Sequence, residues 1–161
     1  MAERWFEDYV PGSVHQLGRV TMDEQELLEF ARKYDPQPMH TDPEAAAKTQ
    51  YGGLIASGWH TAALMMRLLV TEYLSPASSL GSPGVDELRW SRPVRPGDTL
   101  SVRVTVEEAR VSSSKPDRGI IRSRTEVTNQ HGETVMTVRA ANFMLRNPAE
   151  RETARSGRSR A

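Results

Sequence analysis

Hydrophobic and polar residues alternate through much of the second half of the chain. The alternation is most regular over 100–107, where Leu or Val occupies every second position and polar or charged residues lie between them. A period of two is typical of a strand that buries one face. Further strands are expected at 14–20, 85–90, 121–127 and 134–145. The turn sequence Asn-Gln-His-Gly at 129–132 indicates a hairpin between the last two, so an antiparallel meander is predicted.

The first half of the chain has helical spacing instead. Thr21 and Glu24 have the form of a capping box, so a helix is expected to follow them. It should end within the two residues before Pro36, because a proline disfavours helical geometry in the residue that precedes it. A second helix is expected to begin after Asp42, an N-cap residue followed by a proline, and to reach about residue 48.

The longest predicted helix covers about 59–74. It is apolar on most sides, with these hydrophobic residues: Ala62, Ala63, Leu64, Met65, Met66, Leu68, Leu69, Val70 and Leu74. A helix that is apolar nearly all round is normally surrounded by the rest of its protein. The predicted fold class is therefore α+β, with an antiparallel β-sheet wrapped around a long central helix.

Length and composition limit how the chain is organised. At 161 residues with 37% hydrophobic content, the chain suits a single domain, which we place at 1–147. Residues 148–161 are arginine-rich and lack periodicity, so we expect a disordered tail there. Lysine plus arginine and aspartate plus glutamate number 21 each, so the overall charge does not favour a nucleic-acid partner.

The sequence contains no cysteine and no long uninterrupted apolar segment. Without cysteine there is neither a disulfide nor a thiolate ligand or nucleophile, which is compatible with a reducing cytoplasm. The longest apolar run, 62–70, is interrupted by Arg67, and residues 1–8 lack an apolar signal core. We therefore expect a soluble, unprocessed, cytoplasmic protein that has no membrane partner.

The candidate chemistry lies in a proline-rich segment after the first helix. Asp35 and His40 are five positions apart, with Pro36 and Pro38 between them. The prolines exclude a regular helix and push the residues before them into extended conformations, so a stiff loop is predicted. A carboxylate and an imidazole held on such a loop are suited to acid–base chemistry. The plain alternative is a capped helix end followed by a surface histidine.

A longer pattern extends this pair. It combines Asp35-x-x-Pro38-x-His40-x-Asp42, a glycine-led apolar helix from Gly58, and the segment Pro-Val-Arg-Pro-Gly-Asp at 93–98. Over about residues 20–145 the pattern resembles the MaoC-like (R)-specific enoyl-CoA hydratases, the hydratase 2 group of the hot-dog fold. The resemblance implies a homodimer with its active sites near the interface. It also implies reversible hydration of trans-2-enoyl-CoA thioesters to (R)-3-hydroxyacyl-CoA, with coenzyme A as part of the substrate and no metal or redox cofactor.

The resemblance further implies roles for single residues. Asp35 and His40 would hold and activate one water, and the backbone N–H of Gly58 would bind the thioester carbonyl oxygen. Negative charge develops on that oxygen as water adds, and the positive end of a helix dipole stabilises such charge. Substrate contacts are expected from four more residues: Tyr34, Gln37, Ser57 and Met66.

Some of these positions depart from the common family pattern. Tyr34 and Gln37 stand where relatives often have glycine and asparagine, so they are expected to alter the acyl pocket. Met66 belongs to an apolar stripe that is either core or a flexible wall of an acyl tunnel. Three arginines are either solvated charges or ligands for the phosphates of coenzyme A: Arg89, Arg92 and Arg95.

Two other functions remain open. A hot-dog acyl-CoA thioesterase would need an acid or nucleophile on the central helix, where only Glu72 is available, near the far end. A non-catalytic acyl-thioester-binding module would keep the pocket without turnover, and the departures at 34 and 37 are compatible with it. A serine hydrolase is not favoured, because Ile55 stands where the Gly-x-Ser-x-Gly motif around Ser57 would have its first glycine.

Overall fold

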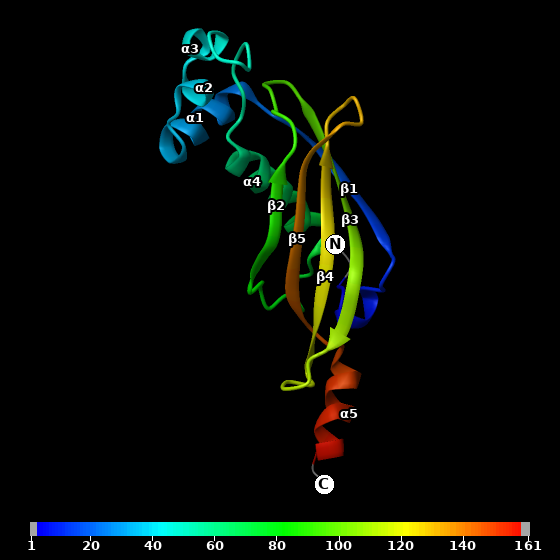
Figure 1. Ribbon diagram of the computed structural model, residues 1–161. Helices are drawn as coiled ribbons and strands as arrows, with labels where there is room; N and C mark the ends of the chain where they lie inside the picture. Colours follow the sequence, from blue (N-terminus) through cyan, green and yellow to red (C-terminus); the bar gives the residue numbers. More distant parts are fainter. Residues whose placement is uncertain (1–2, 159–161) are drawn as a thin grey trace.

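A five-stranded antiparallel sheet and a long helix form the body of the protein (Figure 1). The computed structural model describes the backbone of residues 3–158 and the side chains of residues 3–153. The elements, in order, are η1 (Phe6–Asp8), β1 (Val14–Thr21), α1 (Glu24–Tyr34), α2 (Pro38–Thr41), α3 (Pro43–Ala47), α4 (Gly58–Leu68), the π-helical η2 (Leu69–Tyr73), β2 (Gly84–Trp90), β3 (Thr99–Val111), β4 (Arg118–Thr128), β5 (Thr134–Leu145) and α5 (Pro148–Arg158). The strand order β1-β3-β4-β5-β2 leaves β1 and β2 at the edges.

The sheet curves around α4, while α1, α2 and α3 gather at one end of it and α5 extends from the other (Figure 1). The core lies between the sheet and α4. It contains every second residue of the first part of β3 and one side of α4, including Leu100, Val102, Val104, Val106, Leu64, Met65 and Leu68. This is the α+β arrangement of the hot-dog fold, so the predicted fold class is confirmed.

Helix α4 is continued by a π-helical turn. The Leu74 N–H donates to the Leu69 carbonyl at 2.7 Å, and the continuous helix covers 58–73, close to the predicted 59–74. The expectation that this helix is enclosed on all sides is wrong for the single chain. The sheet covers one side only, and three large apolar side chains on α4 and η2 remain exposed: Trp59, Met66 and Val70.

Two local predictions in the first half need correction. The N-cap of α1 is Asp23, whose carboxylate accepts from the Glu26 N–H at 2.9 Å; Thr21 is still part of β1, where it pairs with Thr99. The prolyl segment is not a plain loop, because Pro38 begins the short helix α2. A proline is well suited to the first turn of a helix, where its missing N–H would have no intrahelical partner.

The C-terminal segment also differs from the expectation of a disordered tail. Its described residues form α5, and residues 159–161 lie outside the described part of the chain. Asn147 caps this helix by accepting from the Glu150 N–H at 3.0 Å. Glu7 accepts from both the Arg146 side chain and the Asn147 N–H, at 2.9 Å each, and so ties the start of α5 to the domain. Asn147 followed by a proline was the sequence signal for this helix.

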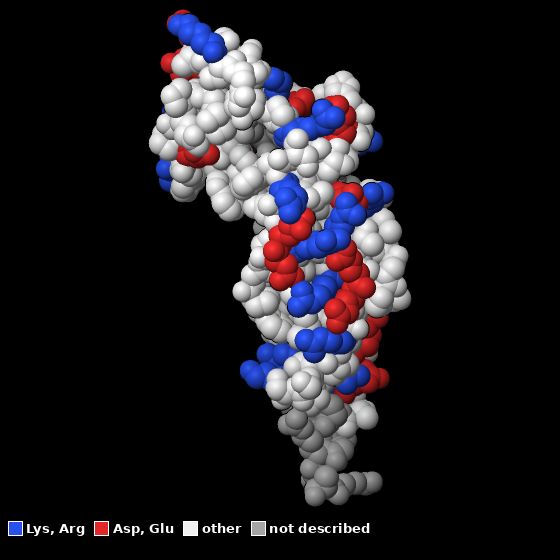
Figure 2. Space-filling model, viewed as in Figure 1, with Lys and Arg blue, Asp and Glu red and all other residues white. Residues whose placement is uncertain are grey.

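Charged side chains of both signs cover one face of the molecule (Figure 2). Several of these charges come from the strands, where arginines pair with neighbouring carboxylates, as Arg122 does with Asp86 at 2.6 Å and Arg103 with Glu126 at 2.6 Å. Within the part of the chain that the structure describes, no helix combines the length and hydrophobicity that a membrane crossing requires.

Candidate active site

A cavity of about 450 Å³ opens where the start of α4 meets the proline-rich segment and the end of β2. Its walls come from residues 35–40, from 51–56, from the first turn of α4, and from 90–94. Four of the predicted site residues lie on these walls: Asp35, Gln37, His40 and Gly58. The fold therefore brings together residues that are up to 23 positions apart in the sequence.

Asp35 is the C-cap of α1, with φ −149° and ψ 67°, so its backbone has left the helical region, as expected for a residue before a proline. Its two carboxylate oxygens are each held by a donor: Gln37 Nε2 donates to Oδ1 at 2.7 Å, and Ser57 Oγ donates to Oδ2 at 2.7 Å. The Gln37 amide, followed by the Ser57 hydroxyl, lowers the pKa of Asp35; partial burial opposes them, and the adjacent His40 lowers it further. Asp35 is therefore held as a carboxylate.

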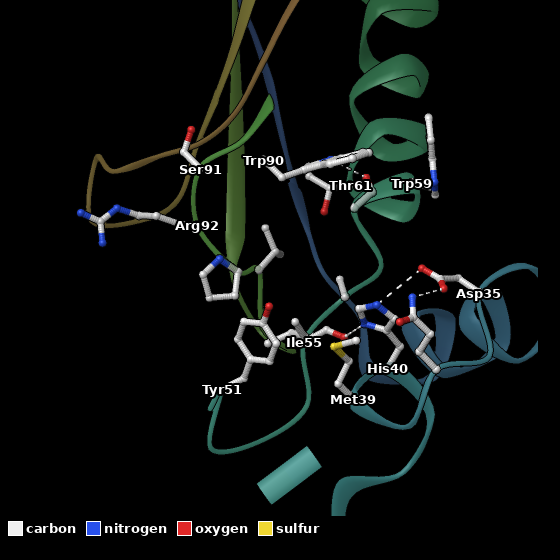
Figure 3. Close-up of a pocket in the computed structure, with 15 residues that line it drawn as sticks. Asp35, Met39, His40, Tyr51, Ile55, Trp59, Thr61, Trp90, Ser91 and Arg92 are labelled. Atoms are coloured by element: carbon white, nitrogen blue, oxygen red, sulfur yellow. Dashed lines mark hydrogen bonds and ion pairs between the residues drawn. The ribbon is translucent and has the colours of Figure 1, made fainter. Parts of the chain in front are cut away.

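His40 lies on α2 with its ring almost fully buried. Its Nδ1 is 2.8 Å from the Ile55 carbonyl oxygen, and its Nε2 is 3.5 Å from Asp35 Oδ2 (Figure 3). A carbonyl only accepts, so we assign the proton of the neutral ring to Nδ1. Nε2 is then an unprotonated acceptor that faces the carboxylate of Asp35.

Gly58 is the first residue of α4, after Ser57 as N-cap. Among the described residues, the Gly58 N–H has no hydrogen-bond acceptor, as is usual in the first turn of a helix. A side chain at this position would collide with Trp90, since a Cβ would lie 2.5 Å from the indole ring. Trp90 also donates from Nε1 to the Gly58 carbonyl at 3.0 Å. The glycine thus allows the N-terminus of the helix and an indole from β2 to meet at the cavity.

Trp59 and Trp90 form part of the cavity wall that the sequence analysis did not find. Their rings meet edge to face with centroids 5.1 Å apart, beside the first turn of α4 (Figure 3). The two residues come from different elements, and no short sequence motif links them. Only the packing of β2 against α4 reveals this aromatic wall.

The site therefore combines an ionised carboxylate, an imidazole with a free acceptor nitrogen, and the positive end of a helix. The family profile described as "MaoC like domain" matches residues 9–130. The chain belongs to this family. The predicted resemblance to MaoC-like dehydratases is thereby confirmed, and the match covers every predicted site residue.

Solved structures support the same family assignment. A MaoC-like dehydratase from Rhodospirillum rubrum is 41% identical and has a TM-score of 0.83, with 90% of this chain and 99% of that chain covered. An R-hydratase from Pseudomonas aeruginosa is 29% identical with a TM-score of 0.69, covering 88% of this chain and 85% of the other.

A relative with an assigned activity is similar over a shorter stretch. A 3-hydroxybutyryl-CoA dehydratase from Methylorubrum extorquens is 32% identical over 105 residues, which is 65% of this chain and 64% of that protein. These relatives support a hydratase or dehydratase activity for this MaoC-like chain as a class.

Three predicted substrate contacts of the MaoC-like site lie away from the cavity wall of the single chain. Ser57 is fully buried behind Asp35, to which it donates. Tyr34 is 64% exposed, and its ring packs on Phe30 with ring centroids 5.0 Å apart. Met66 is 47% exposed, on the side of α4 that the sheet leaves uncovered. Tyr34 therefore does not narrow the cavity in this chain.

The arginines considered for phosphate binding occupy different surroundings. Arg92 lies on the cavity wall and is 3.3 Å from Glu133. Arg95 donates to the Tyr51 carbonyl, next to the cavity. Arg89 pairs with Glu87 at 3.1 Å and is not a wall residue. Arg92 and Arg95 thus stay candidates for an anionic part of a ligand, whereas Arg89 does not.

Glu72, which a thioesterase would need, and the buried His60 of α4 are both engaged away from the cavity. Glu72 lies in η2, and its carboxylate accepts from the Gly18 N–H at 2.7 Å, in the irregular part of β1 rather than in the cavity. His60 is buried and stacked on Phe30, with ring centroids 4.7 Å apart, and burial lowers its pKa. Neither side chain lies on the cavity wall.

Proposed function

We propose that this chain catalyses the reversible hydration of trans-2-enoyl-CoA thioesters to (R)-3-hydroxyacyl-CoA. The observation that carries the proposal is that one cavity is lined by Asp35, by His40 and by the start of α4 at Gly58. Family membership and the names of the similar hydratases and dehydratases support the same reaction class. Coenzyme A enters as part of the substrate, and the proposed reaction needs no metal or redox cofactor.

The Asp35–His40 pair is suited to binding one water molecule. Asp35 Oδ2 and the unprotonated Nε2 of His40 are both acceptors and are 3.5 Å apart. Two acceptors cannot bond to each other, but a water that donates one hydrogen to each would satisfy both. Such a water keeps its oxygen lone pairs free to attack the β carbon of an enoyl thioester.

The N-terminus of α4 is suited to the other end of the reacting group. Adding water at the β carbon moves charge onto the thioester oxygen, which becomes enolate-like. The Gly58 N–H has no acceptor among the described residues, and it lies at the positive end of the helix dipole. A preorganised donor of this kind stabilises charge that develops in the transition state.

A second copy of the chain is proposed to cover the exposed side of α4. Trp59, Ala63, Met66 and Val70 recur there at helical spacing and are all exposed. In the described chain β2 pairs only with β5, so its other edge is free beside this stripe. Because Trp59 lies on both the stripe and the cavity wall, a homodimer formed here would add walls to the site.

The dimer is tested by light scattering of the wild-type chain and of Met66→Glu. A charged side chain in an apolar interface is costly, so the variant should shift to a monomer while the wild type is a dimer. Arg122→Glu, on the sheet, is the matched control and should remain dimeric. A monomeric wild type, or a dimeric Met66→Glu variant, would count against this interface.

The reaction is tested with crotonyl-CoA as the probe. Absorbance of the conjugated thioester should fall without release of free thiol, and chiral analysis should identify (R)-3-hydroxybutyryl-CoA. A series of longer and branched enoyl-CoA substrates extends the assay. Release of thiol would instead indicate a thioesterase. Saturable binding across the series without turnover would indicate an acyl-thioester-binding module.

A further inference from the structure

We infer that Ser57 and Gln37 are positioning residues that hold both oxygens of Asp35, so that His40 Nε2 carries the proton between water and substrate. The inference rests on the proposed function and deepens it. Neither side chain is required here to touch the substrate, which is the role the sequence predicted for them. Their shared target is the Asp35 carboxylate, approached from two different parts of the chain.

Ser57 connects Asp35 to the helix that would bind the thioester. Its side chain is fully buried, its hydroxyl donates to Asp35 Oδ2 at 2.7 Å, and its oxygen accepts from the Trp59 N–H at 3.3 Å. A hydroxyl has one hydrogen, and here the carboxylate receives it. The position of the Asp35 carboxylate is thereby coupled directly to the first turn of α4.

Gln37 holds the second oxygen from the cavity side. Its Nε2 donates to Oδ1 at 2.7 Å, and its backbone N–H donates to the Asp35 carbonyl at 2.8 Å. Pro36 and Pro38 flank it and restrict the backbone on both sides. This geometry explains how glutamine, which is longer than the asparagine often found in relatives, can still donate to Asp35. The turn between the prolines directs its amide back onto the carboxylate two residues earlier.

These donors decide which member of the pair accepts a proton. Donors to an ionised carboxylate stabilise its charged form, in agreement with the lowered pKa of Asp35, whose largest cause is Gln37, then Ser57. Among the described residues, His40 is the titratable side chain within ion-pair distance of Asp35. Within residues 3–153 no donor reaches His40 Nε2, and the ring proton on Nδ1 is directed at the Ile55 carbonyl. Nε2 is therefore the available base.

With His40 Nε2 as the base, the protons and electrons of the hydration are all accounted for. One O–H bond of water breaks as its oxygen bonds to the β carbon, and His40 Nε2 takes the proton. The π electrons of the double bond shift through the α carbon to the carbonyl oxygen. The proton on Nε2 passes to the α carbon as the carbonyl re-forms. Asp35 stays anionic throughout. It accepts a hydrogen bond from the second O–H of the water and stabilises the imidazolium.

The first test does not depend on activity. Carbon-13 NMR follows the titration of the Asp35 carboxyl in the wild type, Ser57→Ala, Ser57→Thr and Gln37→Met. Ser57→Ala and Gln37→Met should each titrate at higher pH than the wild type, whereas Ser57→Thr, which retains a hydroxyl, should stay close to it. Matched controls are Gln25→Met, which removes a glutamine bonded to Glu29 on α1, and Ser78→Ala, a buried serine elsewhere.

The second test measures crotonyl-CoA turnover. Loss of either donor should lower kcat about tenfold, with a much smaller change in KM. An unchanged Asp35 titration in both Gln37→Met and Ser57→Ala overturns the inference. If Ser57→Ala does not fold, the Asp35 titrations of Gln37→Met and Ser57→Thr decide whether the inference holds. If the Asp35 titration shifts in the variants but the wild type shows no turnover, the positioning roles of Ser57 and Gln37 hold and the proposed function is wrong.

Discussion

Two contacts between a basic and an acidic side chain in this protein differ in distance and in consequence. On the sheet, Arg122 Nη1 lies 2.6 Å from Asp86 Oδ2, and the two side chains are 46% and 56% exposed. In the cavity, His40 and Asp35 are 3.5 Å apart, with side chains 7% and 19% exposed. The shorter contact lies in water and the longer one in a sheltered site. Surroundings, more than distance, decide what such a pair can do.

The physical reason is solvent screening and the number of fixed partners. On the sheet, Arg122 lies within ion-pair distance of both Asp86 and Glu108, and such exposed pairs contribute little because water weakens them. In the cavity, every polar atom of Asp35 and the Nδ1 atom of His40 has an assigned partner. The sheet charges are therefore exposed to water on one face (Figure 2), while the cavity side chains are held in one geometry.

The largest effect is expected from the cavity pair. Asp35→Asn and His40→Ala should each lower the rate of crotonyl-CoA hydration by about 10²–10⁴-fold, because each removes a group that binds or deprotonates the water. Circular dichroism should show an unchanged fold. Arg122→Ala serves as the control on the sheet and should retain wild-type turnover. A wild-type rate in both cavity variants would contradict the assignment of Asp35 and His40 as the catalytic pair.

The next effect concerns the helix that meets the cavity pair. Gly58→Ala should lower turnover at least tenfold and destabilise the fold by about 1–3 kcal/mol, because the new methyl overlaps the Trp90 indole. Thermal denaturation and the hydration assay measure the two effects separately. The double variant Gly58→Ala, Trp90→Ala restores the space and should recover part of the stability. Full wild-type stability of Gly58→Ala alone would contradict this packing.

The pH dependence of stability should distinguish the two pairs further. The folded pKa of Asp35 is lowered below its unfolded value of about 3.9, so its contribution is present above that value. The contribution is lost as pH falls from there through the folded pKa. Urea unfolding of the wild type and Asp35→Asn between pH 7 and pH 3 should therefore give a stability difference that changes only below about pH 4. A difference that changes between pH 5 and pH 7 would contradict the direction of this shift.

The smallest effect is expected on the sheet. Arg122→Ala should change the free energy of unfolding by less than about 1 kcal/mol, and the difference should diminish at high salt, because its partners are exposed. Urea unfolding at low and high ionic strength measures it. A loss of several kcal/mol would mean that the sheet pairs are held as firmly as the cavity pair.

Much of the fold could be predicted from local pattern. The alternation of Leu100, Val102, Val104 and Val106 located β3, because a strand with one buried face repeats every two residues. Capping signals were less reliable for predicting where an element begins or ends. Asp23 rather than Thr21 caps α1, because the pairing of Thr21 with Thr99 extends β1 to that point.

The candidate site was predictable only in part. Asp35 and His40 could be found because two prolines and a short spacing are visible in the chain. Trp90 could not, because it reaches Gly58 from a strand that begins far along the sequence. Tyr34 and Met66 were expected at the substrate, but their side chains point away from the cavity of the single chain, since neighbours in sequence can face opposite sides of a helix.

Local sequence was enough to predict the five strands, most of the helices and the two residues that offer acid–base chemistry. Periodicity and proline act over a few residues, so they can be read without a fold. The folded arrangement was needed to see that Ser57 and Gln37 each hold one oxygen of Asp35, that Ile55 sets the tautomer of His40, and that Trp90 requires glycine at the start of α4. These are directed contacts, and a hydrogen bond depends on where two atoms lie rather than on how far apart they are in the chain.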